Sequence, residues 1–183
     1  MSENNSHLPA LISRSQIETR VTEIGREITD HFAGKELTVI GLLKGCFIFM
    51  ADLVRAIHLP VHIDFMEISS YGDAQQSSGI IKIVKDLRHS IEDRHVLLVE
   101  DIVDTGLTLN HVMELLETRR PASLHIAALL VKEVKQELRY PVEFRGFDIE
   151  DHFVVGYGLD YRGYYRNLNY VAIVEAESQM KLF

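Results

Sequence analysis

Apolar residues recur at helical spacing early in the chain and later gather into short, nearly continuous runs. The helical set is Ile17, Val21, Ile24, Ile28 and Phe32, which lie on one face of a helix. The tetrapeptide Ser15-Gln16-Ile17-Glu18 has the form of a capping box, and Gly34 is suited to end the helix. The pattern predicts an amphipathic helix that follows a flexible arm of residues 1–14.

The later apolar runs have the length of strands and alternate with two more helical patterns. One helical pattern contains Phe47, Met50, Val54 and Ile57, and the other contains Val112, Leu115 and Leu116. The predicted strands are residues 37–43, 61–69, 80–84, 96–99, 124–131, 153–155 and 171–174, with a polar loop at 70–79. This alternation predicts an α/β fold in which a central, mostly parallel sheet carries helices on both faces. We expect residues 1–183 to form one domain.

Charged residues directly follow three of these apolar runs. Lys44 follows the first strand, the pair Glu100-Asp101 follows the run at 96–99, and Lys132 follows the run at 124–131. Parallel sheets bind ligands at the carboxyl ends of their strands. We therefore expect these side chains to converge at one edge of the sheet.

Composition limits the classes of partner. The chain has 183 residues and a net charge of −8, with a sequence pI of about 5.6, so bulk attraction to nucleic acid or an anionic membrane is not expected. The first residues lack the basic and apolar regions of a secretion signal, and no apolar run is long enough to span a bilayer. A single cysteine, Cys46, excludes an intrachain disulfide. We expect a cytoplasmic protein.

The stretch VEDIVDTGLT, residues 99–108, places a short polar turn between a predicted strand and a predicted helix. The amides of Thr105, Gly106, Leu107 and Thr108, with two threonine hydroxyls, are suited to bind a phosphate at a helix start. The turn is not a Walker A loop, because Leu107 stands where a lysine would be needed. The alternative is an ordinary helix cap.

Three acids in the same stretch suggest what else is bound. Glu100 and Asp101 are suited to hold Mg²⁺ or to accept hydrogen bonds from a sugar diol. The alternative is a solvated strand end. Asp104 lies farther along and is suited to act as a general acid or base. Phosphate, diol and cation together describe a phosphorylated ribose.

This combination resembles the phosphoribosyl-diphosphate (PRPP) motif of the type I phosphoribosyltransferases. Four segments narrow the resemblance to the hypoxanthine-guanine phosphoribosyltransferases. They are LLKGCFIFMADL at 42–53, VEDIVDTGLTL at 99–109, LLVKE at 129–133 and FVVGYGLDYRGYYRNLNYVAIV at 153–174. The resemblance implies that the terminal segments add a small hood to the sheet.

The resemblance also implies a role for each candidate residue. Asp104 would exchange a proton near purine N7, and Lys132 would donate to the 6-oxo group. Phe153 would stack on the base while the Val154 backbone reads its edge. Glu100 and Asp101 would bind the ribose and Mg²⁺, and Asp160, near the base, would bind a second Mg²⁺. The 5′-phosphate would be bound by Thr105, Gly106, Leu107 and Thr108. Pyrophosphate would be contacted by Lys44, Gly45 and Arg166, with an often cis peptide before Lys44, and a lid would begin at Ser70 and Tyr71.

For several of these positions a simpler interpretation stays open. Without the resemblance, Lys132 is an ordinary exposed lysine, Phe153 a core aromatic and Asp160 a turn residue. For Arg166 the alternative is stacking on tyrosines or a dimer contact.

The resemblance implies purine salvage, with PRPP and a 6-oxopurine as substrates and Mg²⁺ as cofactor. It also implies a homodimer or homotetramer, with no nucleic-acid or membrane partner. One alternative is a transferase for another base, such as xanthine or uracil. Another is a regulator that senses PRPP. A third is a phosphoacceptor receiver domain, which would have no use for the Thr105–Thr108 turn.

Overall fold

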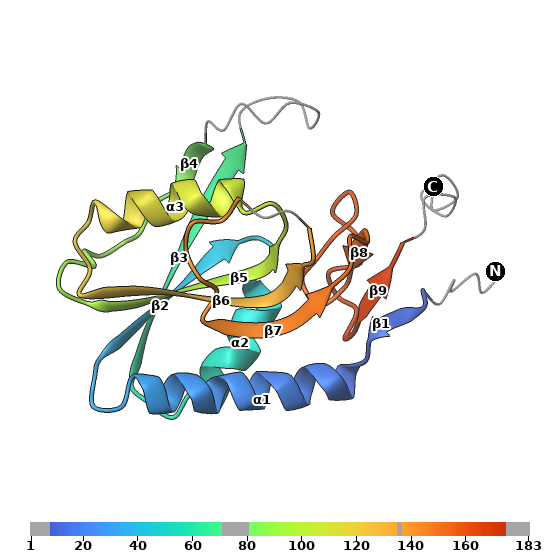
Figure 1. Cartoon of the computed structure of the whole chain (residues 1–183), viewed down its shortest axis with the longest axis horizontal. Helices are drawn as coiled ribbons and strands as arrows, with labels where there is room; N and C mark the ends of the chain where they lie inside the picture. The colour runs from blue at the N-terminus through green and yellow to red at the C-terminus, as the bar shows by residue number, and fades with distance from the viewer. Residues whose placement is uncertain (1–7, 71–80, 135–136, 175–183) are drawn as a thin grey trace.

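The computed structural model describes residues 8–70, 81–134 and 137–174. A six-stranded sheet has the order β4-β3-β2-β5-β6-β7, and every pairing is parallel except that of β4 with β3 (Figure 1). The strands are β2 (Leu37–Leu43), β3 (Val61–Ser70), β4 (Ile81–Lys85), β5 (His95–Val103), β6 (Ser123–Lys132) and β7 (Phe144–Ile149). The predicted α/β fold with a mostly parallel sheet is confirmed.

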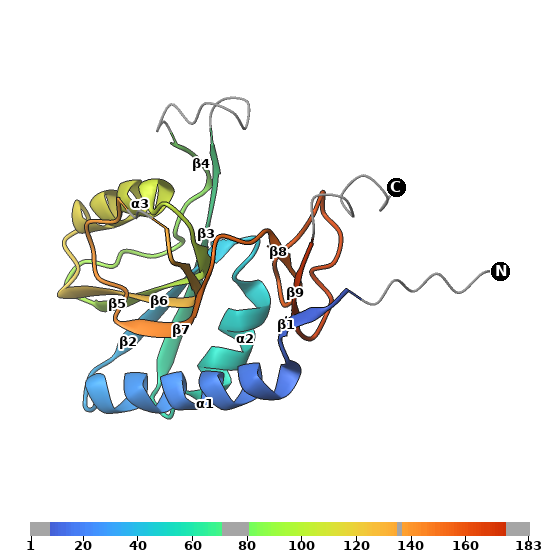
Figure 2. The ribbon, with the colours of Figure 1, turned by 45° about the vertical axis from the view of Figure 1, so that its right-hand side comes forward.

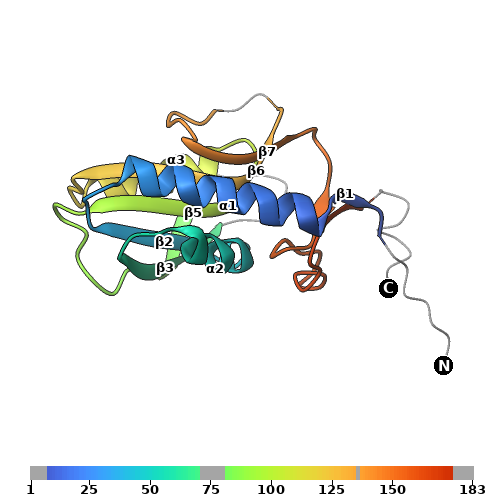
Figure 3. The same ribbon diagram turned by 90° about the horizontal axis from the view of Figure 1, so that it is seen from below.

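Helices cover both faces of this sheet, as predicted. The helices α1 (Arg14–His31) and α2 (Phe47–Ala56) lie on one face, and α3 (Leu107–Glu117) lies on the other (Figures 1 and 2). From below, α1 and α2 lie side by side beneath the strands (Figure 3).

The central strands are apolar at successive positions because each face has its own core. In β5, Leu97 and Val99 belong to the core under α1 and α2, whereas Val96 and Leu98 belong to the core under α3. Successive strand residues point to opposite faces, so a strand covered on both sides must be apolar throughout. The run that marked this strand in the sequence is therefore a direct result of the two-layer covering.

A small antiparallel sheet stands at one end of the molecule. Its order is β1-β9-β8, formed by Ala10–Ile12, Val171–Ile173 and Val154–Val155 (Figure 2). This sheet is the hood implied by the resemblance. The prediction of a flexible arm over residues 1–14 is wrong for its second half, because β1 pairs with β9 and α1 begins at Arg14. Residues 1–7 lie outside the described part of the chain.

The first helix begins two residues earlier than predicted. Ser13, not Ser15, is the N-cap, and its side chain accepts a hydrogen bond from the Gln16 amide. The Gln16 side chain accepts in turn from the Ser13 amide at 2.9 Å, which completes a capping box. Both serines fit the motif in sequence, and in the structure Ser13 is the one that caps the helix.

The sequence analysis missed β7. Its residues, FRGFDI, include Arg145 and Asp148, which form an ion pair at 2.9 Å. As the last strand in the order, β7 pairs only with β6, so part of it faces solvent and lacks an apolar run.

Within the described residues, no helix is long and apolar enough to cross a membrane.

Replacing the observed N-cap tests the start of α1. We expect Ser13→Ala to lower the free energy of unfolding by about 1 kcal/mol, because it leaves first-turn amides without their acceptor. Ser15→Ala is the matched control and is expected to change stability by less than about 0.5 kcal/mol. Urea unfolding followed by circular dichroism measures both. A larger loss of unfolding free energy for Ser15→Ala than for Ser13→Ala would indicate that Ser15 is the N-cap, as the sequence predicts.

Candidate active site

The Lys44-Gly45 turn lies between two other segments that are far away in the sequence. It follows β2 directly, and the Leu43–Lys44 peptide is cis, as the resemblance implies. A Cβ atom on Gly45 would lie 1.7 Å from Asp101 Oδ2. A Cβ atom on Gly158, which has φ +107°, would lie 2.1 Å from the Gly45 carbonyl oxygen. The backbone of Gly45 therefore packs against the Asp101 carboxylate on one side and against the hood loop at Gly158 on the other.

The two adjacent acids lie inside β5 rather than just beyond it, which corrects the predicted strand end. Glu100 is in register with Ala128 of β6, and Asp101 is 8% exposed. Burial raises the pKa of Asp101 to about 6, although backbone amides and Arg166 oppose the shift. Burial, and then the charge of Asp101, raise the pKa of Glu100 well above its ordinary value. A solvated strand end is therefore excluded.

These carboxylates fit a cation or a hydroxyl-rich ligand. Glu100 Oε2 is buried and has no hydrogen-bond partner among the described residues. A buried carboxylate oxygen is costly unless a donor or a cation compensates it, and Mg²⁺ prefers such oxygen ligands. In residues 8–70, 81–134 and 137–174, no group of three or more acidic, histidine or cysteine side chains could by itself hold a metal ion.

The Thr105–Thr108 turn has the predicted position between a strand and a helix. Gly106 is the N-cap of α3 with φ +82°, so neither Asp104 nor Thr105 occupies the capping position, and Gly106 has no side chain that could cap the helix. The Glu137 amide donates to the Thr105 carbonyl at 2.8 Å, which ties the turn to the segment after β6. The helix-cap alternative is not supported, and the first amides of α3 are placed to meet an anion.

Lys132, the last residue of β6, lies between two acids. Its Nζ donates to Asp104 Oδ2 at 3.0 Å and to Asp151 Oδ1 at 2.8 Å. Partial burial disfavours the ammonium, but the hydrogen bonds to Asp151 and Asp104 outweigh it and raise the pKa of Lys132. The Lys132 hydrogen bond lowers the pKa of Asp151. The alternative interpretation of Lys132 as an ordinary exposed lysine is wrong, because its side chain is only 12% exposed.

The hood supplies the remaining candidates. Arg166 forms an ion pair with Asp160 at 2.6 Å and donates to the Gly158 carbonyl at 2.6 Å. Phe153 is 44% exposed, so it is not a core aromatic, and its ring meets the edge of Tyr161 with centroids 5.6 Å apart. Val154 is buried in β8.

The lid prediction can be followed only at its start. Ser70 is the last residue of β3, and Tyr71 lies outside the described residues.

The structure thus forms two neighbouring groups from the predicted residues. Gly45, Asp101 and Arg166 form one, since Gly45 contacts Asp101 and the charge of Arg166 acts on that carboxylate. Asp104 and Lys132 form the other. Two residues were missed by the sequence analysis. Asp151 lies in the acid-rich turn just before Phe153, and Gly158 lies in the repeated glycines of VVGYGLD, so both had a signal in the sequence.

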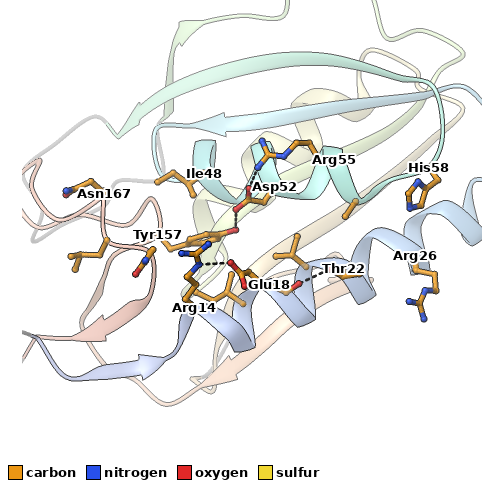
Figure 4. Close-up of a pocket in the computed structure, with 15 residues that line it drawn as sticks. Arg14, Glu18, Thr22, Arg26, Ile48, Asp52, Arg55, His58, Tyr157 and Asn167 are labelled. Carbon is orange, nitrogen blue, oxygen red and sulfur yellow. Dashed lines mark hydrogen bonds and ion pairs between the residues drawn. The ribbon is translucent and has the colours of Figure 1, made fainter.

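A separate groove of about 800 Å³ lies between α1, α2 and the hood (Figure 4). The Tyr157 hydroxyl donates to Asp52, and Asp52 also pairs with Arg55 (Figure 4). Burial and this hydrogen bond raise the pKa of Tyr157. The groove is lined by none of the predicted site residues.

Comparisons with known proteins show which family the chain belongs to. Residues 12–162 match the phosphoribosyl transferase domain family. A hypoxanthine-guanine phosphoribosyltransferase of Dictyostelium discoideum is 50% identical over 175 residues, which cover 93% of this chain and 97% of that protein. A hypoxanthine phosphoribosyltransferase of Escherichia coli K12 is 46% identical over 90% of this chain and 93% of its own length. The crystal structure of a hypoxanthine phosphoribosyltransferase from Staphylococcus aureus has a TM-score of 0.91 at 40% identity, covering 96% of this chain and 98% of that one.

Adding one methyl group at Gly45 tests the close packing of the site. We expect Gly45→Ala to weaken binding of PRPP, the ligand expected from the sequence, by about tenfold or more, because the methyl would displace the Asp101 carboxylate. Gly34→Ala is the control, since nothing lies within 4 Å of its added Cβ and only its positive φ penalises it. Isothermal titration calorimetry measures both affinities. Unchanged PRPP affinity in Gly45→Ala would show that the turn and the carboxylate are not coupled.

Proposed function

Because the chain belongs to the hypoxanthine-guanine phosphoribosyltransferases of the phosphoribosyltransferase family, we propose that it transfers the 5-phosphoribosyl group of PRPP to hypoxanthine or guanine. The products are IMP or GMP and pyrophosphate, and the role is purine salvage. The observation that carries the proposal is the contact between Lys132 and Asp104 beside the Thr105–Thr108 turn. It provides a donor for the base and a proton acceptor next to a phosphate site.

The base is read by groups from β5, β6 and the hood. Lys132 donates a hydrogen bond to the 6-oxo oxygen. Adenine has an amino group at this position, which cannot accept that hydrogen bond, so adenine is rejected. The exposed ring of Phe153 stacks on the purine, and the Val154 backbone meets its edge. Asp104 takes the proton from N7 as N9 forms the bond to ribose.

The phosphoribosyl half is held by different chemistry. Backbone amides and hydroxyls of residues 105–108 bind the 5′-phosphate without a lysine. Glu100 and Asp101 accept hydrogen bonds from the ribose hydroxyls. They also stabilise the positive charge that develops at ribose C1 as pyrophosphate leaves. Lys44, the Gly45 amide and Arg166 contact the pyrophosphate.

Mg²⁺ is the cofactor of this proposal. Glu100 and Asp101 would hold one ion, in keeping with the unpartnered Glu100 Oε2, and Asp160 would hold a second. When bound, the ion would neutralise part of the charge of the leaving pyrophosphate. The chain's own share is to orient PRPP through the turn at 105–108 and to exclude water with a lid that begins at Ser70 and Tyr71.

Assembly and location follow from the family and from composition. We propose a homodimer or homotetramer that works in the cytoplasm, with PRPP and a 6-oxopurine as its substrates. The net charge of −8 argues against a nucleic acid or an anionic membrane as partner.

A panel of five bases, hypoxanthine, guanine, xanthine, adenine and uracil, tests the function. We expect nucleotide formation from PRPP and Mg²⁺ with hypoxanthine and guanine, and kcat/KM at least about a hundredfold lower with adenine and uracil. Lys132→Met should reduce kcat/KM for hypoxanthine by about tenfold or more, because the 6-oxo oxygen loses its charged donor. Lys35→Met, which removes a lysine on an exposed turn after α1, is the control and should retain full activity. Nucleotide release is followed by chromatography.

The other outcomes identify the alternatives. Product with only xanthine or only uracil would make the protein a transferase for that base. PRPP binding without product from any base would make it a PRPP-sensing regulator. Either result would overturn the proposed function.

A further inference from the structure

Asp151 is a residue to which neither the sequence nor the proposed function gives a role. It lies between β7 and β8, and its carboxylate accepts a hydrogen bond from Lys132 Nζ at 2.8 Å. This contact is as close as that from Lys132 to Asp104, at 3.0 Å. The side chain of Asp151 is 68% exposed, so the carboxylate is not required to fill the core.

The arrangement follows from the order of the strands. β6 lies between β5 and β7, and all three run in parallel, so their carboxyl ends lie side by side (Figure 1). The chain leaving β5 supplies Asp104, β6 ends in Lys132, and the chain leaving β7 supplies Asp151. The ammonium is therefore held from both sides by carboxylates on separate segments.

The proposed chemistry makes these two carboxylates unequal. When Asp104 accepts the N7 proton of the purine it becomes neutral, and its charge-assisted hold on Lys132 is lost. Asp151 does not face the N7 proton in this proposal, and its lowered pKa keeps it ionised. It can hold the ammonium throughout the reaction.

On this basis we propose that Asp151 is a positioning residue that keeps Lys132 aimed at the 6-oxo oxygen while Asp104 changes its charge. The inference rests on the proposed function and adds a residue to its base-recognition site. Without Asp151, the ammonium is drawn toward Asp104. That shift takes Lys132 out of line with the 6-oxo oxygen.

Neutralising Asp151 while keeping its shape tests this role. We expect Asp151→Asn to raise KM for hypoxanthine and Kd for IMP by about tenfold, the loss of one charge-assisted hydrogen bond, and to leave KM for PRPP within about twofold. Glu150→Gln is the matched control, because it removes a neighbouring charge that pairs with His152 rather than Lys132. Asp151→Glu should recover part of the lost affinity. The urea midpoint should stay near that of the wild type in all three variants.

A double-mutant cycle separates positioning from a general electrostatic effect. In the Lys132→Met background, adding Asp151→Asn should change Kd for IMP by less than about twofold, because the side chain that it positions is gone. Calorimetric binding of IMP measures this even where turnover is slow, since the phosphate turn still holds the nucleotide.

Two results would overturn the inference while leaving the proposed function intact. One is a tenfold rise in Kd for IMP when Asp151→Asn is added to Lys132→Met. The other is an Asp151→Asn variant whose KM for hypoxanthine and Kd for IMP equal those of Glu150→Gln. A wild type that forms no nucleotide from any 6-oxopurine would instead overturn the proposed function.

Discussion

The backbone of Gly45 lies so close to the Asp101 carboxylate that no side chain fits between them. A Cβ atom would meet Oδ2 at 1.7 Å, and on the other side Gly158 touches the Gly45 carbonyl with equally little room. These contacts hold together three segments: the turn after β2, the part of β5 that contains Asp101, and the hood loop that contains Gly158. The Lys44-Gly45 turn cannot shift without displacing the Asp101 carboxylate. In the proposed function, this constraint couples the residues that contact pyrophosphate to those that hold the ribose.

The parallel sheet supplies the rest of the geometry. Its strand order places β5 between β2 and β6, so the Thr105–Thr108 turn after β5 lies between the Lys44-Gly45 turn and Lys132. In the proposed function, neutral amides of the Thr105–Thr108 turn bind the 5′-phosphate, the buried acids bind the sugar and its cation, and the Lys132 ammonium binds the base. Under this proposal, three acids next to a phosphate site are compatible because they face different parts of one substrate.

The elements that the sequence predicted well are those whose burial is complete. The runs at 37–43 and 124–131 became β2 and β6 with little change, and Lys44 and Lys132 lie at their ends. The weaker predictions concern elements whose partners are distant. β1 has only three residues and pairs with the distant β9, and Ser13, which directly follows β1, caps α1 in place of Ser15. β7 is an edge strand with polar residues.

The site shows the same division. Glu100 and Asp101 were recognised from their order in VEDIVDTGLT, but their place inside β5, which buries them and raises their pKa values, depends on pairing with β6. The acid-rich turn before Phe153 is visible in the sequence, but only the arrangement of the sheet shows that Asp151 is the acid of this turn that contacts Lys132. Local patterns therefore revealed the residue types of the site, and the strand order decided which of them meet.

A crystal structure of the protein with IMP and Mg²⁺ would show whether the phosphate, the sugar and the base meet the predicted residues. We expect the 5′-phosphate at the amides of residues 105–108, the 6-oxo oxygen within hydrogen-bond distance of Lys132 Nζ, and Asp104 facing N7. Lys132 should still contact Asp151. A nucleotide bound in the groove between α1, α2 and the hood, or a base turned away from Lys132, would contradict it.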